Sequence, residues 1–146
     1  MTEIILGGFL WAPSIEYWND ILDIIDENYK IIRVKKYKFG SFEDLERVII
    51  RLYENDKSAP LNKIKKIKIA TLKEYEPVCL NFYFKVKSNG NVKKIPDVIE
   101  MKKMIRHKFR DNIRNYKRDI IIHISDNPKQ TSFVDNLIDN YIRKKN

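Results

Sequence analysis

The chain has 146 residues, of which 43% are hydrophobic and 34% charged, and its formal net charge at pH 7 is +9. This size and composition predict one globular domain spanning residues 1–146. Its apolar runs are much shorter than the roughly 20 residues that a membrane span needs, and its first residues lack the pattern of a signal peptide. We therefore expect a cytoplasmic protein with no membrane segment.

Common catalytic and metal-binding motifs are absent from the sequence. It contains no GxGxxG, Walker A, HExxH or GxSxG motif, which excludes the commonest dinucleotide-binding, P-loop, zinc-protease and hydrolase classes. The single cysteine, Cys79, excludes an internal disulfide and is expected to be a buried thiol, because it lies in a strand-like run. With two histidines and no carboxylate cluster at ligand spacing, no metal site made of side chains alone is predicted.

The first part of the chain alternates strands and helices. A first strand is predicted over residues 3–6, with an extension as far as Leu10 as the alternative. Ser14 is then expected to cap a helix. Residues 29–38 predict a second strand. Ser41, with an acidic residue three positions later, is expected to begin a second helix.

The middle of the chain contains the clearest strand. Residues 63–72, before it, are open to two interpretations, a strand or an irregular insertion. Apolar and other residues then alternate, with Leu80, Phe82, Phe84 and Val86 in one set and Cys79, Asn81, Tyr83 and Lys85 in the other. The first set is expected to face the core, and Asn81, Tyr83 and Lys85 are expected to face away.

The remaining elements define the predicted fold class. A helix capped by Asp97, a last strand and a last helix complete four strand-helix pairs. The helix after Asp97 is expected to bury Val98, Met101, Met104 and Ile105. Because the central strand is expected to be half-exposed, an antiparallel α+β sheet is favoured over a parallel one. The predicted architecture is a ferredoxin-like antiparallel sheet with helices on one face, plus extra elements.

Residues 120–128 place one of the two histidines between an apolar strand and the start of a helix. Asn127 suits the N-cap, Pro128 suits the first helical position, and Gln130 completes a variant of the capping box. The N–H groups and the positive dipole end of that helix would lie beside His123, a setting that favours phosphate. The alternative interpretation, a packed structural histidine, stays open.

Positive charge is concentrated between Lys93 and Arg118, where ten Lys or Arg residues and three acidic residues give a net charge of +7. A second basic block consists of Lys63, Lys65, Lys66, Lys68 and Lys73. Such concentrations attract polyanions, whether nucleic acid, a nucleotide or another phosphorylated ligand, and a solvated lysine-rich surface is the alternative. Arg106, Arg110 and Arg114 lie four residues apart and are expected to form a phosphate-binding stripe on a helix.

Three short runs carry a family resemblance. Residues 120–127 read Ile-Ile-Ile-His-Ile-Ser-Asp-Asn, residues 105–109 read Ile-Arg-His-Lys-Phe, and residues 76–80 read Glu-Pro-Val-Cys-Leu. In these runs the chain resembles the nucleoside diphosphate kinases, which have Asn-Ile-Ile-His-Gly-Ser-Asp-Ser, Ile-Arg-Gly-Asp-Phe and Gly-Pro-Val-Val. The family's phosphate-binding Lys-Pro-Asp is replaced by Trp-Ala-Pro at 11–13, and the asparagine and glycine of the histidine motif are replaced by isoleucines.

The resemblance implies a function for the candidate site. It implies a phosphotransferase in which His123 accepts phosphate from a nucleotide that carries its own Mg²⁺. Ser125 would fix the tautomer of the imidazole through a hydrogen bond. Arg106 would clamp the phosphates, with Arg110 or Arg114 in support.

A second class of function is kept beside this one. A non-catalytic basic module could bind nucleic acid by stacking bases on Tyr29, Tyr37, Tyr83 or the aromatic residues around Phe84, or could bind an acidic protein partner. Whether the protein is an enzyme, and in which oligomeric state it exists, both stay open.

Overall fold

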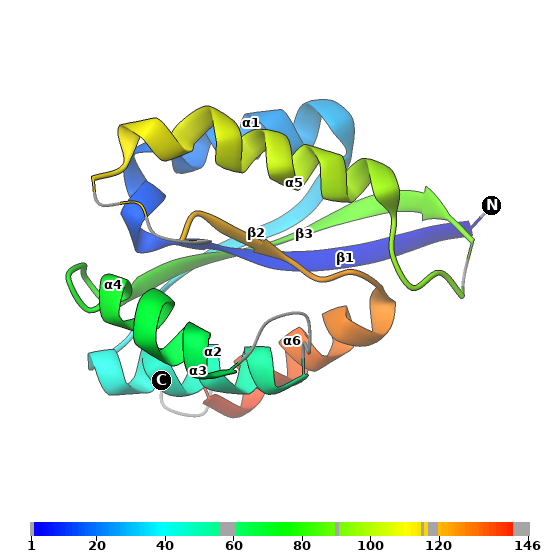
Figure 1. Ribbon diagram of the computed structural model, residues 1–146. Helices are drawn as coiled ribbons and strands as arrows, with labels where there is room; N and C mark the ends of the chain where they lie inside the picture. The colour runs from blue at the N-terminus through cyan, green and yellow to red at the C-terminus, as the bar shows by residue number, and fades with distance from the viewer. Residues whose placement is uncertain (1, 56–60, 90, 115, 117–119, 142–146) are drawn as a thin grey trace.

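Four strands form one antiparallel sheet in the part of the chain that the computed structural model describes, residues 2–55, 61–89, 91–114, 116 and 120–141. They are β1 (Thr2–Trp11), β2 (Lys30–Lys38), β3 (Val78–Ser88) and β4 (Ile122–Ile124). Their order in the sheet is β2-β3-β1-β4, and every neighbouring pair is antiparallel (Figure 1). The predicted antiparallel α+β sheet is confirmed.

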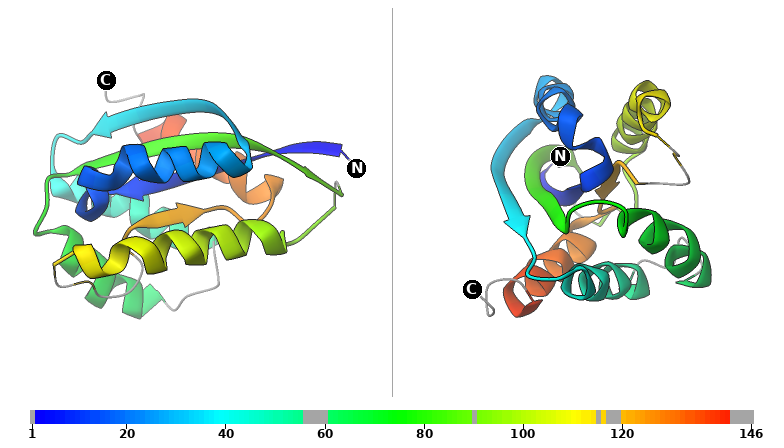
Figure 2. Two further views of the ribbon diagram at one scale, coloured as in Figure 1. Left: turned by 90° about the horizontal axis from the view of Figure 1, so that it is seen from above. Right: turned by 90° about the vertical axis from the view of Figure 1, so that its left-hand side faces the viewer.

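Helices cover both faces of this sheet. The elements of the first group are η1 (Ala12–Tyr17), α1 (Trp18–Asn28), α5 (Pro96–Phe109) and η3 (Arg110–Asn112), and those of the second are α2 (Phe42–Asn55), α3 (Leu61–Lys63), η2 (Ile64–Ile69), α4 (Ala70–Leu72) and α6 (Pro128–Tyr141). Figures 1 and 2 show α1 and α5 on one face and α2, α4 and α6 on the opposite face. None of the helices in the described ranges is long and apolar enough to cross a membrane.

The ferredoxin-like core consists of β1, α1, β2, β3, α5 and β4, and its two helices lie on one face as predicted. The extra elements are the helical insertion between β2 and β3 and the terminal helix α6. They occupy the second face of the sheet, so helices cover both faces once these extra elements are included. Both α2 and α6 bury apolar stripes there, at Leu45, Val48, Ile49, Leu52, Val134, Leu137 and Ile138.

Strand β3 is buried on both faces as a result. The predicted core set is buried, with Phe82 and Phe84 fully inaccessible. Asn81 and Tyr83, which were expected to face away from the core, are buried as well, and of the other set only Lys85 keeps partial exposure. The buried polar atoms have partners, because the Asn81 amide donates to the Gly8 carbonyl at 3.0 Å and the Tyr83 hydroxyl bonds to Asp135 of α6. The alternation along β3 therefore reflects a difference in polarity between its two faces, and not a difference in their solvent exposure.

Two of the predicted helix starts are wrong. Ser14 lies inside η1 and donates its hydroxyl to the Trp11 carbonyl at 3.0 Å, so α1 begins later without a side-chain cap. Asp97 lies in the first turn of α5, whose N-cap is Ile95. Ser41 is confirmed as a cap, since its hydroxyl accepts a hydrogen bond from the Asp44 N–H at 3.3 Å.

The segment left open between strand and irregular insertion is helical. Residues 63–72 run through the end of α3, the π-helix η2 and α4. The basic block is divided within this segment: Lys63 and Lys73 are exposed, whereas Lys68 is 1% exposed.

The two edges of the sheet differ in length and in charge. Strand β2 has nine residues and β4 has three. Along β2 the exposed positions include Ile32 and Val34 between the cations Lys30, Arg33, Lys35, Lys36 and Lys38. The short edge β4 carries the candidate histidine.

Candidate functional site

His123 is the middle residue of β4 and lies opposite Phe9 of β1. Its ring packs edge-on against Tyr53 of α2, with ring centroids 5.5 Å apart, so the side chain lies on the sheet face that α2 and α6 cover. Only 5% of the residue is exposed. The position at the sheet edge is as predicted, but the expected solvent accessibility of His123 is wrong, because α2 covers it.

The helix start after His123 has the predicted cap. Asn127 Oδ1 accepts a hydrogen bond from the Gln130 N–H at 3.0 Å, and Gln130 Oε1 accepts one from the Asp126 N–H at 2.8 Å. Pro128 is the first residue of α6. These bonds fix the turn that leads from the histidine strand into the helix.

Ser125 connects this turn to β1 and not to the imidazole. Its hydroxyl lies 2.5 Å from the Thr131 hydroxyl, and the Gly7 N–H donates to both oxygens, at 3.3 and 3.2 Å. Ser125 is 1% exposed. The hydrogen bond that would let Ser125 fix the tautomer of His123 is absent from this arrangement, so its hydroxyl holds α6 against the sheet instead.

Gly8 allows β4 to approach β1 closely at the histidine. A Cβ atom at this position would lie 2.1 Å from the His123 carbonyl oxygen and 2.8 Å from the Phe82 ring. Any larger residue would push β4 away from its neighbour, since the first of these contacts is with backbone. The position of His123 therefore depends on a glycine in another strand.

The electrostatic surroundings keep His123 neutral. Burial lowers the pKa of its imidazole well below the usual value, and the positive charges of Lys68, Lys102 and Arg106 lower it further. A neutral ring has a nitrogen lone pair, which a nucleophile or a hydrogen-bond acceptor requires. No hydrogen bond joins the ring nitrogens to another residue in the part of the chain that the structure describes.

Lys68 and Tyr53 are part of this site, and the sequence analysis did not single out either. Lys68 Nζ lies 2.5 Å from the Tyr53 hydroxyl and 4.9 Å from the centre of the Trp11 ring. The only signal was the place of Lys68 in the basic block, which does not distinguish a buried lysine from an exposed one.

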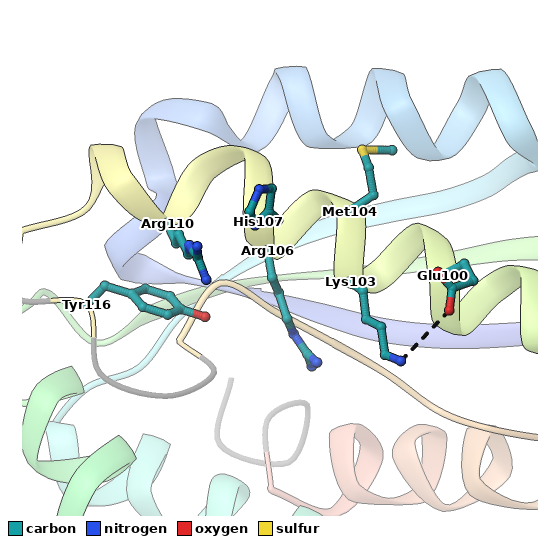
Figure 3. A pocket seen from close by; sticks show the side chains of 7 residues that line it. All are labelled: Glu100, Lys103, Met104, Arg106, His107, Arg110 and Tyr116. Atoms are coloured by element: carbon teal, nitrogen blue, oxygen red, sulfur yellow. Dashed lines mark ion pairs between the residues drawn. The ribbon is translucent and has the colours of Figure 1, made fainter.

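A pocket of about 640 Å³ lies along α5, beside β4 (Figure 3). It is lined by Glu100, Lys103, Met104, Arg106, His107, Arg110 and Tyr116. Arg106 Nη2 donates to the Ile122 carbonyl at 3.2 Å, which ties this arginine to the residue before His123. Met104, expected in the core, is 44% exposed and contributes to the pocket wall.

The predicted arginine stripe is only partly formed. Arg106 and Arg110 line the same pocket, but Arg114 does not. Helix α5 ends at Phe109, a 3-10 turn follows, and the chain becomes extended at Ile113, whose side chain is buried. Burial of Ile113 redirects the chain, so the four-residue spacing no longer places Arg114 on the helix.

Two of the three tyrosines proposed for base stacking are buried. Tyr37 and Tyr83 are each 4% exposed, whereas Tyr29 is partly exposed and packs against Phe84 with ring centroids 5.4 Å apart. Tyr37 and Tyr83 therefore cannot offer their rings to the bases of single-stranded nucleic acid in this conformation.

The donor atoms of the pocket suit an anion better than a cation. Among the described residues, no three His, Cys, Asp or Glu side chains gather as metal ligands. The single carboxylate of the pocket, Glu100, is paired with Lys103 at 3.8 Å (Figure 3). A divalent cation brought by a nucleotide would thus be held by the phosphates, with Glu100 as the nearest protein carboxylate in the pocket.

Comparison with known proteins identifies relatives by fold only. No family model matches the chain, and no curated protein matches it in sequence. The nucleoside diphosphate kinase of Aquifex aeolicus superposes with a TM-score of 0.56 and 16% identity, over 94% of this chain and 95% of that one. An NDP kinase from Pyrobaculum aerophilum gives 0.54 and 14%, over 93% and 95%. The resemblance to nucleoside diphosphate kinases is confirmed for the fold, which by itself does not carry function.

Proposed function

We propose that this protein binds a nucleotide by its phosphate groups in the pocket that lies along α5 and is lined by Arg106, Arg110 and Tyr116. The observation that carries the proposal is the joint lining of this pocket by Arg106 and Arg110, two of the arginines that the sequence predicted as phosphate ligands. Guanidinium groups form strong charge-assisted hydrogen bonds with phosphate oxygens. Tyr116 and Met104 add an aromatic ring and an apolar side chain to the same wall, which suits a nucleoside.

The proposal is tested by calorimetric titration with ATP, AMP and a short single-stranded oligonucleotide. ATP should bind more tightly than AMP, because more phosphate oxygens meet the arginines. The Arg106→Ala/Arg110→Ala double variant should bind ATP roughly ten- to a hundredfold more weakly, the effect of losing one or more charge-assisted hydrogen bonds. Higher salt should weaken binding, since the pocket is open to solvent.

Arg114→Ala is the matched control, because Arg114 is exposed and lies outside the pocket. It should bind ATP like the wild type. Equal ATP affinity in the double variant and the wild type would refute the proposal. Tighter binding of the oligonucleotide than of ATP would instead support the non-catalytic nucleic-acid module.

Phosphoryl transfer through His123 is a second candidate function, favoured by the neutral imidazole one residue from the carbonyl that Arg106 binds. In this step an imidazole nitrogen would bond to the terminal phosphorus while the bond to the bridging oxygen breaks, releasing the nucleoside diphosphate. Burial of His123 opposes the step in the conformation described, so Tyr53 would have to move aside.

A labelling experiment separates this candidate from simple binding. With γ-labelled ATP, the wild type should acquire an acid-labile, base-stable label, the stability pattern of phosphohistidine, and His123→Ala should not. His107→Ala is the control, since His107 is exposed and is the other histidine of the chain. An unlabelled wild type that still binds ATP would leave nucleotide binding without phosphoryl transfer.

A further inference from the structure

A second pocket, of about 620 Å³, adjoins the pocket that contains Arg106 and Arg110, the arginine pocket. This α1–α5 pocket is lined by Asn28, Tyr29, Asp97, Glu100, Met101 and Met104. Glu100 and Met104 line the arginine pocket as well, so the two pockets share these walls. Figure 3 shows both residues at the end of the arginine pocket that is away from Arg110 and Tyr116. A ligand that extends past Met104 therefore passes from one pocket into the other.

The two pockets differ in charge. The arginine pocket contains Lys103, Arg106 and Arg110, whereas no Lys, Arg or His is among the described residues that line the α1–α5 pocket. The α1–α5 pocket contains two carboxylates instead, on a chain whose net charge is +9. One of them, Glu100, pairs with Lys103 at 3.8 Å, so its charge is partly neutralised where the pockets meet. Together the pockets suit a ligand that is anionic at one end and offers hydrogen-bond donors at the other.

The polar groups of the α1–α5 pocket are two acceptors beside one hydroxyl. Asp97 contributes its carboxylate. The Asn28 amide nitrogen donates to the Ile24 carbonyl at 2.8 Å, so the amide oxygen is the atom that remains for a ligand. Burial, and then the negative charge of Asp97, raise the pKa of Tyr29, so its hydroxyl keeps its proton and can donate it to a ligand. The ring of Tyr29 is held by its packing against Phe84.

Among the nucleobases, guanine carries the complementary edge. Its N1–H and N2–H groups are adjacent donors, and one carboxylate can accept both, as it accepts the two N–H groups of a guanidinium. Its O6 is an acceptor for a hydroxyl. Adenine has a ring nitrogen with a lone pair where guanine has N1–H, and this lone pair would face the carboxylate. The pocket therefore favours guanine over adenine.

The length of α5 fits a nucleotide that reaches both pockets. Asp97 lies in the first turn of this helix and Arg106 in its last turn. The helix has 14 residues, and at about 1.5 Å per residue its ends are roughly 20 Å apart. An extended nucleoside triphosphate spans most of this length. Met104, which is 44% exposed, lies between the two ends and gives the nucleoside an apolar surface.

We propose that the α1–α5 pocket is a guanine site, so that the nucleotide held by the arginine pocket is a guanine nucleotide. Asp97 accepts N1–H and N2–H of the base, and the Tyr29 hydroxyl donates to O6. The triphosphate extends past Met104 to Arg106 and Arg110. The inference rests on the proposed function and adds a base preference to it, with Asp97 and Tyr29 as the residues that determine this preference.

Asp97 also has a purely structural role to be distinguished from this one. An acidic residue in the first turn of a helix stabilises that helix through its dipole. Loss of this charge changes the thermal midpoint of the chain, but it does not distinguish one base from another. The deciding measurement is therefore the ratio of the affinities for two nucleotides that differ only in their base.

Calorimetric titrations of the full chain with GTP, ITP and ATP measure this ratio. GTP should bind about tenfold or more tightly than ATP, as expected for one bidentate contact with a base, and ITP, whose base lacks the N2 amino group, should lie between them. In Asp97→Asn the preference for GTP should disappear, and xanthosine triphosphate, whose O2 accepts from the new amide, should bind more tightly than to the wild type. Asp23→Asn, an exposed acid of α1 outside both pockets, is the matched control and should keep the wild-type order.

Tyr29→Phe removes the donor to O6 and keeps the ring that packs on Phe84. It should weaken GTP binding severalfold and leave ATP binding unchanged, and it is the deciding variant if Asp97→Asn does not fold. Equal affinities of the wild type for GTP and ATP would overturn the inference. So would a ratio of GTP to ATP affinity that stays at the wild-type value in whichever of these two variants is folded.

The Arg106→Ala/Arg110→Ala double variant separates this inference from the proposed function. If GTP and ATP bind equally and both depend on the two arginines, the guanine site is refuted and nucleotide binding in the arginine pocket stands. If the double variant keeps the wild-type affinity for GTP while Asp97→Asn loses the preference for it, the phosphate site is refuted and the guanine site stands. A wild type that binds neither nucleotide refutes both.

Discussion

Both faces of the sheet are covered by helices, but they contain different chemistry. Beneath α1 and α5, β1 and β3 present Leu6, Leu10, Phe82 and Phe84, all apolar. Beneath α2 and α6 lie Asn81, Tyr83, Lys68 and His123, each buried and most with a polar partner. Both faces gain stability from apolar burial, but the second must in addition satisfy its polar groups one by one. Polar groups held in a dry environment are also those whose chemistry can be altered, as the lowered pKa of His123 illustrates.

The largest effect is expected on the apolar face. Phe82→Ala removes a fully buried ring that stacks on Phe84 at 6.0 Å between centroids, and should lower the free energy of unfolding by about 3–5 kcal/mol. Denaturant unfolding measures the change. Ile32→Ala, on the exposed edge strand β2, is the matched control and should change it by about 0.5 kcal/mol or less. A small loss for Phe82→Ala would mean that the apolar face is not the main source of stability.

A smaller effect is expected from one polar contact on the other face. Tyr83→Phe removes the hydroxyl that bonds to Asp135 of α6, and should lower the free energy of unfolding by about 1.5 kcal/mol, because Asp135 is exposed and regains water. Burial first, and then the bond to Asp135, raise the pKa of Tyr83. The wild type should accordingly lose stability as the pH rises above about 10, the pKa of an unfolded tyrosine, and the variant should lose less. Equal alkaline profiles would contradict this assignment.

The smallest change in the free energy of unfolding at neutral pH is expected for substitution of His123. Because burial and nearby cations lower its folded pKa, the unfolded chain binds a proton that the native chain does not, so stability is complete above about pH 6.5 and falls as the pH decreases below it. The slope attributable to His123 should be at most about 1.4 kcal/mol per pH unit. His123→Phe should remove this part of the slope, whereas His107→Phe should keep it, since His107 is exposed. Identical slopes for the wild type and His123→Phe would show that the imidazole is not neutral when buried.

Local features were predictable in part, since the caps expected at Ser14 and Asp97 are wrong, whereas features that depend on distant packing were not predictable. The caps at Ser41 and at Asn127 involve residues within four positions of each other, and both were found. The antiparallel α+β class was predicted from the order of the elements and is confirmed. Burial of Asn81 depends on the helices of the second face, which lie far away in the sequence.

The same contrast between local features and distant packing applies to the candidate site. His123 and the pocket arginines Arg106 and Arg110 were predicted from short motifs and spacing. Arg114 lies outside the pocket because the helical turns end at Asn112 and the chain is extended at Ile113, which is buried. Lys68 is buried within a π-helical segment, for which the pattern of residues 63–72 gives no period. Ser125 was assigned to the imidazole because it is near in sequence, but the turn directs its hydroxyl to Gly7 and Thr131.

The unequal edges of the sheet have a consequence for self-association of this chain. An unpaired strand edge can add strands from other molecules, and short length or positive charge opposes such growth. At β4 three residues offer little to pair with, and Arg106 already binds the Ile122 carbonyl. At β2 nine residues are protected mainly by the mutual repulsion of their cations, with Ile32 and Val34 exposed between them. Polyanions that neutralise the cations of β2 would therefore remove its protection against fibrillar growth. The positive charge along this strand keeps copies of the chain apart.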